Sequence, residues 1–296
     1  MCGIVGFLNK TNDTHLPAGA TILGMLNALG CRGPDSAGVA LFGPPTDGRY
    51  VLRVKLADNG TRLGELVRSL DAGAEMTSTG AYARLAVSSR IAPAEWAARI
   101  ESLNGGTEVV SLGKSLEIVK QVGSPARLES AYHVSHMPGV HGLGHTRMST
   151  ESIVDLSHSQ PFWGRGAPDL AIAHNGHITN YHQLRRRYQQ RGVKFYTEND
   201  SEIIAIYLAE QLAAGIDLEA GLRGMLRDLD GSFSCVAATA EELGYVRDPF
   251  ALKPLLVAET DRFVAIATEE IAFRAALPGD YEAHETSARE VRVWRR

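Results

Sequence analysis

The beginning of the chain constrains the fold more than any other stretch. Cys2 is followed directly by a short segment, residues 3–8, in which the residues other than glycine are large and apolar. A short apolar run of this kind predicts a buried strand. We therefore expect the chain terminus to be held in the core, with Gly3 and Gly6 letting other backbone approach closely.

Cys2 itself has two interpretations. Methionine aminopeptidase removes Met1 readily when the next side chain is small, and Cys2 would then carry a free thiol and a free α-amino group. Because the pKa of an α-amine is about 7.7–8.0 and that of a thiol about 8.5, the amine could accept the thiol proton near neutral pH. One residue would then supply both nucleophile and base. The alternative is a buried cysteine at the start of an apolar strand, which is common.

Composition excludes several classes of protein. The 296 residues carry a formal net charge of −4, which indicates neither a nucleic-acid partner nor an anionic membrane surface. No apolar run approaches the roughly 20 residues of a transmembrane helix, and no signal peptide is recognisable. The three cysteines are sparse and lack metal-like spacing. We therefore expect a cytoplasmic protein with free thiols and no metal site.

Apolar periodicity predicts a mixture of helices and strands. The expected helices cover residues 22–28, 61–70, 93–103, 128–135, 182–190, 203–213, 218–229 and 269–276. Besides the first segment, the expected strands cover residues 39–42, 50–56, 116–123, 169–173, 233–239, 243–247, 263–268 and 291–294. A short strand is also expected just before Arg147, another after the turn 248–255, and further strand-like alternation runs through 75–90. Hairpin-like strand pairs replace strict βαβ alternation. The pattern favours an α+β domain in which helices cover two sheets.

No interdomain linker is apparent, so we expect a single domain over residues 1–296. The section 50–135 carries no catalytic motif and is interpreted as an insertion or an elaborated lobe. A partner-docking surface and a family-specific elaboration are both compatible with it.

A terminal thiol that attacks a carboxamide needs further groups at fixed places. Asn175 and the backbone N–H of Gly176 could stabilise an oxyanion. An amino-acid substrate also needs a cation for its carboxylate, for which Arg147 is the candidate, and an anion for its ammonium, for which Asp200 is the candidate. Taken singly, Arg147 is more typical of a surface or ion-pair residue, Asn175 with Gly176 is a common turn dipeptide, and Asp200 is more typical of a helix N-cap. Their occurrence together, in this order behind Cys2, is the specific signal.

Three histidines, His145, His174 and His177, lie near these residues. Their spacing has no matching set of carboxylates, so we interpret them as structural or pocket-lining residues and not as metal ligands.

The ordered motifs resemble those of class II glutamine amidotransferase domains, which have the N-terminal nucleophile (Ntn) hydrolase fold. The matching residues are 1–6 (MCGIVG), 32–36 (RGPDS), 144–147 (GHTR), 174–176 (HNG) and 199–202 (NDSE), with a looser match at 248–255. The resemblance implies a four-layer αββα sandwich of two antiparallel sheets, with Cys2 at the tip of a central strand.

The resemblance also implies roles for individual residues. Cys2 would be the nucleophile, and Asn175 with Gly176 would form the oxyanion hole. L-glutamine would be bound through Arg147 and Asp200, and the pocket would include Thr150 and His174. The products would be glutamate and ammonia, with the ammonia passed to a synthase site.

Smaller motifs indicate a branch of the family. Residues 148–150, 160–162 and 175–180 resemble the glutamate synthase branch, whereas Ala251 and Lys253 disfavour the phosphoribosyl branch. Glu151 stands where His or Asn is usual. The chain most resembles the stand-alone amidotransferase subunit of N-methylglutamate synthase. That resemblance implies synthase subunits as partners, with FMN and an iron–sulfur cluster carried by them and no cofactor in this chain. An amidohydrolase for another amide and a catalytically silent assembly subunit are the alternatives.

Overall fold

The first sheet places β1 at its centre. The structure, a computed structural model, describes residues 2–11, 13–57, 60–103, 105–149 and 153–296. Within these residues seven strands pair in the order β15-β13-β14-β1-β8-β2-β7, and every pairing is antiparallel. Their bounds are β1 Gly3–Asn9, β2 Ser36–Phe42, β7 Leu116–Val122, β8 His141–Arg147, β13 Leu256–Glu259, β14 Phe263–Ala267 and β15 Ala283–Glu285.

The second sheet is also antiparallel and has the order β16-β12-β11-β10-β9 within the described residues. Its strands are β9 Phe162–Trp163, β10 Ala171–Ile178, β11 Gly231–Ala238, β12 Glu242–Arg247 and β16 Val291–Arg295. The expected strand 169–173 is therefore too short, because β10 continues through His174 and Asn175 to Ile178. Pairing with β11 extends it, since Asn175 lies opposite Ser234.

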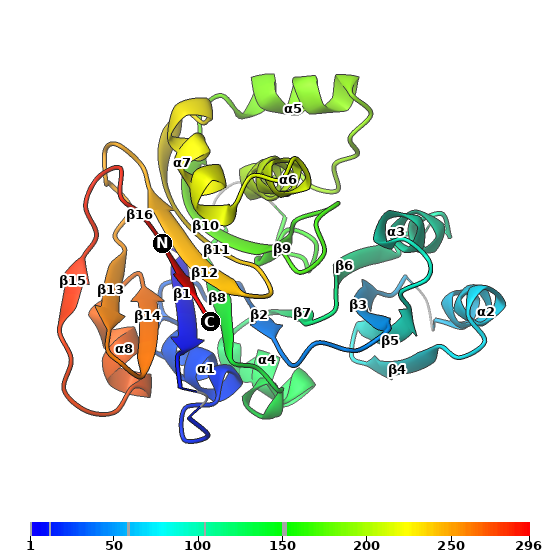
Figure 1. Cartoon of the computed structure of the whole chain (residues 1–296), viewed down its shortest axis with the longest axis horizontal. Helices are drawn as coiled ribbons and strands as arrows, with labels where there is room; N and C mark the ends of the chain where they lie inside the picture. The colour runs from blue at the N-terminus through cyan, green and yellow to red at the C-terminus, as the bar shows by residue number, and fades with distance from the viewer. Residues whose placement is uncertain (1, 12, 58–59, 104, 150–152) are drawn as a thin grey trace.

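Helices cover the outer face of each sheet, which produces four layers (Figure 1). The first sheet is covered by α1 (Ala18–Ala28), α4 (Pro125–Tyr132) and α8 (Glu270–Ala276). The second sheet is covered by α6 (Asp200–Ala213) and α7 (Leu218–Asp228), with α5 (Tyr181–Gln190) packed against α6. The expected α+β sandwich of the αββα type is confirmed.

The two sheets approach closely at β1. All seven residues of this strand are buried, as the apolar run predicts for a strand covered on both faces. A Cβ added at Gly6 would lie 3.2 Å from Cγ1 of Val236 on β11. The absence of a side chain at Gly6 therefore lets the second sheet pack directly onto the start of the chain.

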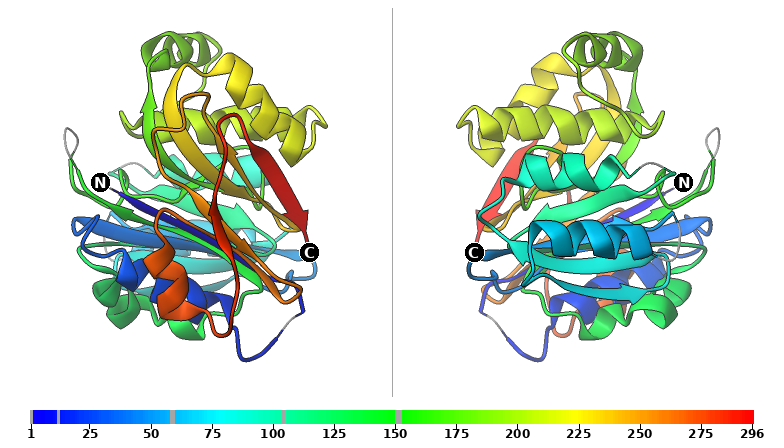
Figure 2. Two further views of the ribbon diagram at one scale, coloured as in Figure 1. Left: turned by 90° about the vertical axis from the view of Figure 1, so that its left-hand side faces the viewer. Right: turned by 90° about the vertical axis from the view of Figure 1, so that its right-hand side faces the viewer.

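A third, smaller sheet lies at one end of the sandwich (Figure 1). Its order is β4-β5-β3-β6, from β3 Arg49–Lys55, β4 Glu75–Thr79, β5 Tyr82–Ser88 and β6 Glu108–Gly113. Figure 2 shows its two helices, α2 (Thr61–Leu70) and α3 (Pro93–Glu101), on the outer side. The separate lobe ends with β6, because β7 pairs with β2 of the first sheet and α4 packs on it. That the lobe is an insertion into a single domain stays a prediction.

One short helix, η1 (Val134–His136), precedes β8. In the part of the chain that the structure describes, no helix is both long and apolar enough to cross a bilayer.

Candidate active site

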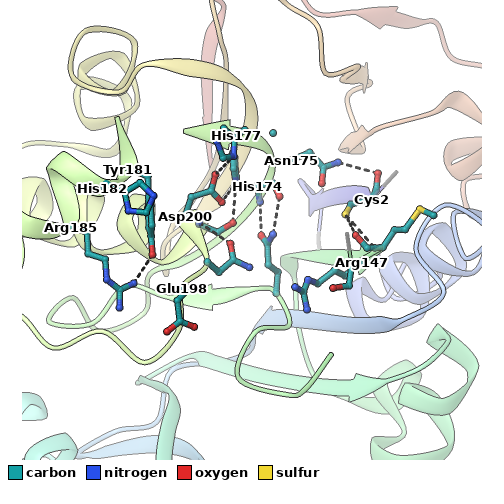
Figure 3. A pocket seen from close by; sticks show the side chains of 16 residues that line it. Cys2, Arg147, His174, Asn175, His177, Tyr181, His182, Arg185, Glu198 and Asp200 are labelled. Carbon is teal, nitrogen blue, oxygen red and sulfur yellow. Dashed lines mark hydrogen bonds and ion pairs between the residues drawn. The ribbon is translucent and has the colours of Figure 1, made fainter. Parts of the chain in front are cut away.

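One cavity of about 570 Å³ collects the residues that the motifs single out (Figure 3). Its lining includes Cys2, Arg147, His174, Asn175, Gly176 and Asp200. Cys2 precedes β1, Arg147 is the last residue of β8, residues 174–176 lie in β10, and Asp200 begins α6. Four elements from both sheets and one helix layer thus converge on the cavity. Thr150 lies outside the described residues, as do Met1 and Glu151.

The thiol of Cys2 is more acidic than an ordinary cysteine. Burial would raise its pKa, but the neighbouring imidazole of His145 lowers it, and the backbone N–H of Met148 adds to the effect. The resulting pKa of Cys2 is about 7. The Met148 N–H donates to Sγ at 3.3 Å. A substantial fraction of Cys2 is therefore thiolate, the nucleophilic form, at neutral pH.

The backbone carbonyl of Cys2 is held by two side chains. Asn175 Nδ2 donates to this oxygen at 3.1 Å, and Arg32 Nε donates to it at 3.3 Å. An amide nitrogen carries two hydrogens, so Asn175 keeps a second donor for another acceptor.

Gly176 occupies a backbone conformation that favours glycine. Its φ is +139°, and an added Cβ would lie 2.1 Å from the carbonyl oxygen of Ser232 on the neighbouring strand. A side chain at this position would push β10 away from β11. Glycine therefore keeps the strand in register beside Asn175.

Arg147 is almost fully buried at the end of β8. Its Nη1 donates to the carbonyl of Ile153 at 3.0 Å. Burial lowers the pKa of Arg147, and the negative charges of Cys2, Asp155 and Asp35 oppose that change. The guanidinium stays charged at neutral pH and can pair with a carboxylate.

Asp200 is the first residue of α6 and not its N-cap, which corrects the prediction from sequence. The cap is Asn199, whose side chain accepts from the N–H of Ser201 at 3.0 Å. Asp200 instead accepts from the N–H of Ile178 at 2.8 Å. Nδ1 of His174 and Nδ1 of His177 lie 3.7 and 3.8 Å from its carboxylate oxygens. Asp200 therefore presents an anion to the cavity from a fixed position.

His174 is buried beside Asp200, and its Nδ1 lies 2.9 Å from Oγ of Ser201. Burial lowers the pKa of His174, so its imidazole is neutral at pH 7. Among the described residues, no group of three or more His, Cys, Asp or Glu side chains is placed to hold a metal ion.

Two supporting residues had no role in the sequence interpretation. The side-chain amide of Gln160 donates to the carbonyl of His174 at 2.9 Å and accepts from its N–H at 2.7 Å. The carboxylate of Glu202 accepts from the N–H groups of Tyr196 and Thr197, both at 2.9 Å. Through these hydrogen bonds, both side chains fix the position of backbone segments next to the cavity. The only feature of the sequence that pointed to Gln160 is its place in residues 160–162, which resemble the glutamate synthase branch.

Comparison with known proteins agrees with this geometry. Residues 145–275 match the family described as a glutamine amidotransferase domain. The glutamine amidotransferase-like protein GlxB of Rhizobium meliloti (strain 1021) is 39% identical over 277 residues, which cover 91% of this chain and 89% of that protein. A protein of Methanothermobacter thermautotrophicus described as a glutamine amidotransferase is 35% identical over 306 residues, covering 99% of both chains.

A solved structure shares the fold. The glutamine phosphoribosylpyrophosphate amidotransferase of B. subtilis superimposes with a TM-score of 0.64 at 19% identity. The match covers 99% of this chain and 47% of that one, so this chain spans about half its length.

An αββα sandwich with a cysteine, serine or threonine at the start of a central strand is typical of the Ntn hydrolase class, and Cys2 has this position directly before β1. Within that class, this chain belongs to the class II glutamine amidotransferases.

Proposed function

We propose that this enzyme hydrolyses L-glutamine to glutamate and ammonia through a thioester on Cys2, within a glutamate synthase-like complex. One observation carries the proposal. An acidic thiol faces the same cavity as a buried guanidinium, Arg147, and a fixed carboxylate, Asp200.

The proposed reaction has two halves. With Met1 removed, the α-amine of Cys2 accepts the thiol proton, and the thiolate attacks the carboxamide carbon. Asn175 Nδ2 and the N–H of Gly176 stabilise the oxyanion. The C–N bond then breaks and the amine returns the proton to the leaving ammonia. Water attacks the remaining thioester, which releases glutamate and regenerates the thiol.

Substrate choice follows from the two charged groups. Arg147 pairs with the α-carboxylate, and Asp200 pairs with the α-ammonium next to His174. A simple amide without a free amino-acid end would form neither of these two charge pairs, at a cost in binding free energy. That cost disfavours the alternative of an amidohydrolase for other amides.

We further propose that the ammonia is used by synthase subunits, of the kind found in N-methylglutamate synthase, which would carry the FMN and the iron–sulfur cluster. The surface of the turn between β12 and β13 supports the proposal that a partner subunit binds there. Phe250 and Leu252 on this turn are 67% and 71% exposed, and large exposed apolar side chains are typical of interaction surfaces. The carbonyl of Lys253, on the same turn, accepts from Oγ of Ser234, which lies opposite Asn175, so the turn packs against the strands that carry the site.

The test uses the enzyme purified from its native source together with whatever accompanies it. Glutamate release from glutamine is expected in the wild type and is lost in Cys2→Ala and Cys2→Ser. Intact mass spectrometry is expected to show that Met1 is absent and that the wild type carries a glutamyl adduct during turnover. Activity of Cys2→Ala, or a retained Met1 in the active protein, would overturn the mechanism. Co-purification without a flavin-containing subunit would overturn the proposed complex and leave the mechanism standing.

A further inference from the structure

We infer that His145 is a positioning residue, which orients the side-chain amide of Asn175 toward the reacting carboxamide. The inference rests on the proposed role of Asn175 in the oxyanion hole.

The contact joins the two sheets of the sandwich. His145 lies on β8, opposite Ile4 of β1, and is completely buried. Asn175 lies on β10 of the second sheet. Nε2 of His145 is 3.0 Å from Oδ1 of Asn175, and Nδ2 of Asn175 donates to the carbonyl of Cys2. A single amide thus connects the imidazole to the backbone of the nucleophile.

These contacts determine where the imidazole hydrogen lies. The carbonyl oxygen of Cys2 only accepts, so the amide nitrogen of Asn175 must face it. The amide oxygen then faces His145 and also only accepts, so Nε2 of His145 must carry a hydrogen. Nδ1 of His145 is buried and has no hydrogen-bond partner among the described residues. His145 therefore acts on Asn175 as a donor.

The side-chain amide needs this support because its last torsion is broad and roughly two-fold. The donor to Oδ1 fixes the plane of the amide, and with it the direction of the second hydrogen on Nδ2. Removing one oxyanion donor from an acyl-transfer site costs about 10²–10³ in kcat, so a misdirected donor should cost part of that factor.

The first experiment compares His145→Leu with His145→Gln in a glutaminase assay. His145→Leu removes the donor and is expected to lower kcat about 10- to 100-fold, with KM for glutamine changed by less than about threefold. His145→Gln keeps an N–H at a similar reach and is expected to recover kcat to within about fivefold of the wild type.

His141→Leu is the matched control. His141 lies on the same strand, is equally buried, and makes one imidazole hydrogen bond, at 2.7 Å to the carbonyl of Thr239. Neither histidine is among the residues that line the cavity, but the hydrogen bond of His141 leads to Thr239 and not to Asn175. Its loss is expected to lower stability while kcat stays within about twofold. An equal loss of kcat in His141→Leu and His145→Leu would assign the effect to packing and overturn the inference.

A double-mutant cycle with Asn175→Ala separates an effect through Asn175 from one on the thiol. Assayed at a pH at which the thiol of Cys2 is ionised in every variant, which removes the effect of His145 on its pKa, adding His145→Leu to Asn175→Ala lowers kcat by less than about twofold if His145 acts through Asn175. A further loss equal to that of the single variant would overturn the inference, as would an unchanged kcat in His145→Leu. If Asn175→Ala itself retains full kcat, the proposed oxyanion hole fails instead.

A measurement without catalysis covers the case in which His145→Leu does not fold. ¹⁵N-histidine NMR of the wild type is expected to show the hydrogen of His145 on Nε2. A hydrogen on Nδ1 alone would overturn the inference.

Discussion

At the scale of single residues, opposing effects set the reactivity of Cys2. Burial disfavours the thiolate, whereas His145 and the N–H of Met148 favour it, and the pKa settles near 7. Cys235 shows burial acting alone, since it is fully buried and its pKa is raised well above the ordinary value. The difference between the two thiols is therefore produced by the neighbours of Cys2 together with its smaller burial.

The first prediction concerns the alkylation of Cys2 by iodoacetamide. Because only the thiolate reacts, a lowered pKa moves the half-maximal rate to lower pH, from about 8.5 for a free cysteine to about 7. Below pH 7 the rate should fall about tenfold per unit. Peptide mass spectrometry measures the rate, and Cys235 in the folded protein is expected to stay unmodified. A midpoint at or above pH 8.5 would contradict the prediction.

The second prediction concerns the charge of Asp200. Asp200→Asn keeps an acceptor for the N–H of Ile178 but loses the anion. Since a hydrogen bond to a charged group contributes about 1.5–3 kcal/mol, KM for glutamine should rise about 10- to 100-fold, with little change in kcat. Steady-state kinetics measure both constants.

Glu198→Gln is the matched control for Asp200→Asn, because Glu198 lines the same cavity but its side chain is 80% exposed. Its KM is expected to change less than about twofold. Equal increases in both variants would indicate a general effect of negative charge and not a specific contact with the ammonium.

At the scale of secondary structure, β10 is the element on which the site depends. The strand carries Asn175 and Gly176. The side-chain amide of Gln160 is hydrogen-bonded to the backbone of His174, and at the end of the strand the N–H of Ile178 donates to Asp200. A displacement of β10 would therefore disturb the oxyanion hole and the ammonium site together.

The third prediction tests this strand with Gly176→Ala. The added Cβ would meet the carbonyl of Ser232 at 2.1 Å at a φ of +139°, so the free energy of unfolding should fall by about 3 kcal/mol or more. Gly192→Ala is the control, since its φ is +84° and no atom lies within 4 Å of an added Cβ. It should cost only about 1 kcal/mol. Urea denaturation measures both, and equal costs would show that steric contact with β11 is unimportant.

At the scale of the whole molecule, the third sheet is attached to the segment that leads into α6. Glu101 on α3 accepts from Arg165 Nη1 at 2.5 Å and from the hydroxyl of Tyr196. The guanidinium of Arg165 lies over the ring of Tyr196, 3.6 Å from its centre. Tyr196 is held in turn by Glu202, so the lobe is connected to the backbone that carries Asp200.

The fourth prediction concerns this connection. Glu101→Gln leaves the partly buried Arg165 without its nearest anion and should lower the free energy of unfolding by about 2 kcal/mol. Hydrogen exchange in residues 194–199 should rise. Glu95→Gln on the same helix is the control, since its pair with Arg99 is half exposed and should contribute less than about 0.5 kcal/mol. Unchanged exchange in 194–199 would show that the lobe does not support the site.

The local pattern of apolar residues in the sequence predicted most of the helices and strands. The helix expected at 61–70 is α2 with the same bounds, because apolar side chains recur at helical spacing there. Strands β6, β9 and β15 were not expected. β9 and β15 have only two and three residues, and the extended conformation of β6 depends on its pairing with β3, which is distant in sequence.

Sequence by itself determined the class of the fold, the identity of the family and some of the residues around the cavity, because ordered motifs and periodicity are local properties. Tertiary structure decided which of those residues touch. His145 and Asn175 are 30 positions apart and meet only because two sheets pack face to face. Likewise, Asn199 and Asp200 are both of residue types that cap helices. In the structure Asn199 forms the cap, whereas Asp200 accepts from the N–H of Ile178 on β10 and faces the cavity.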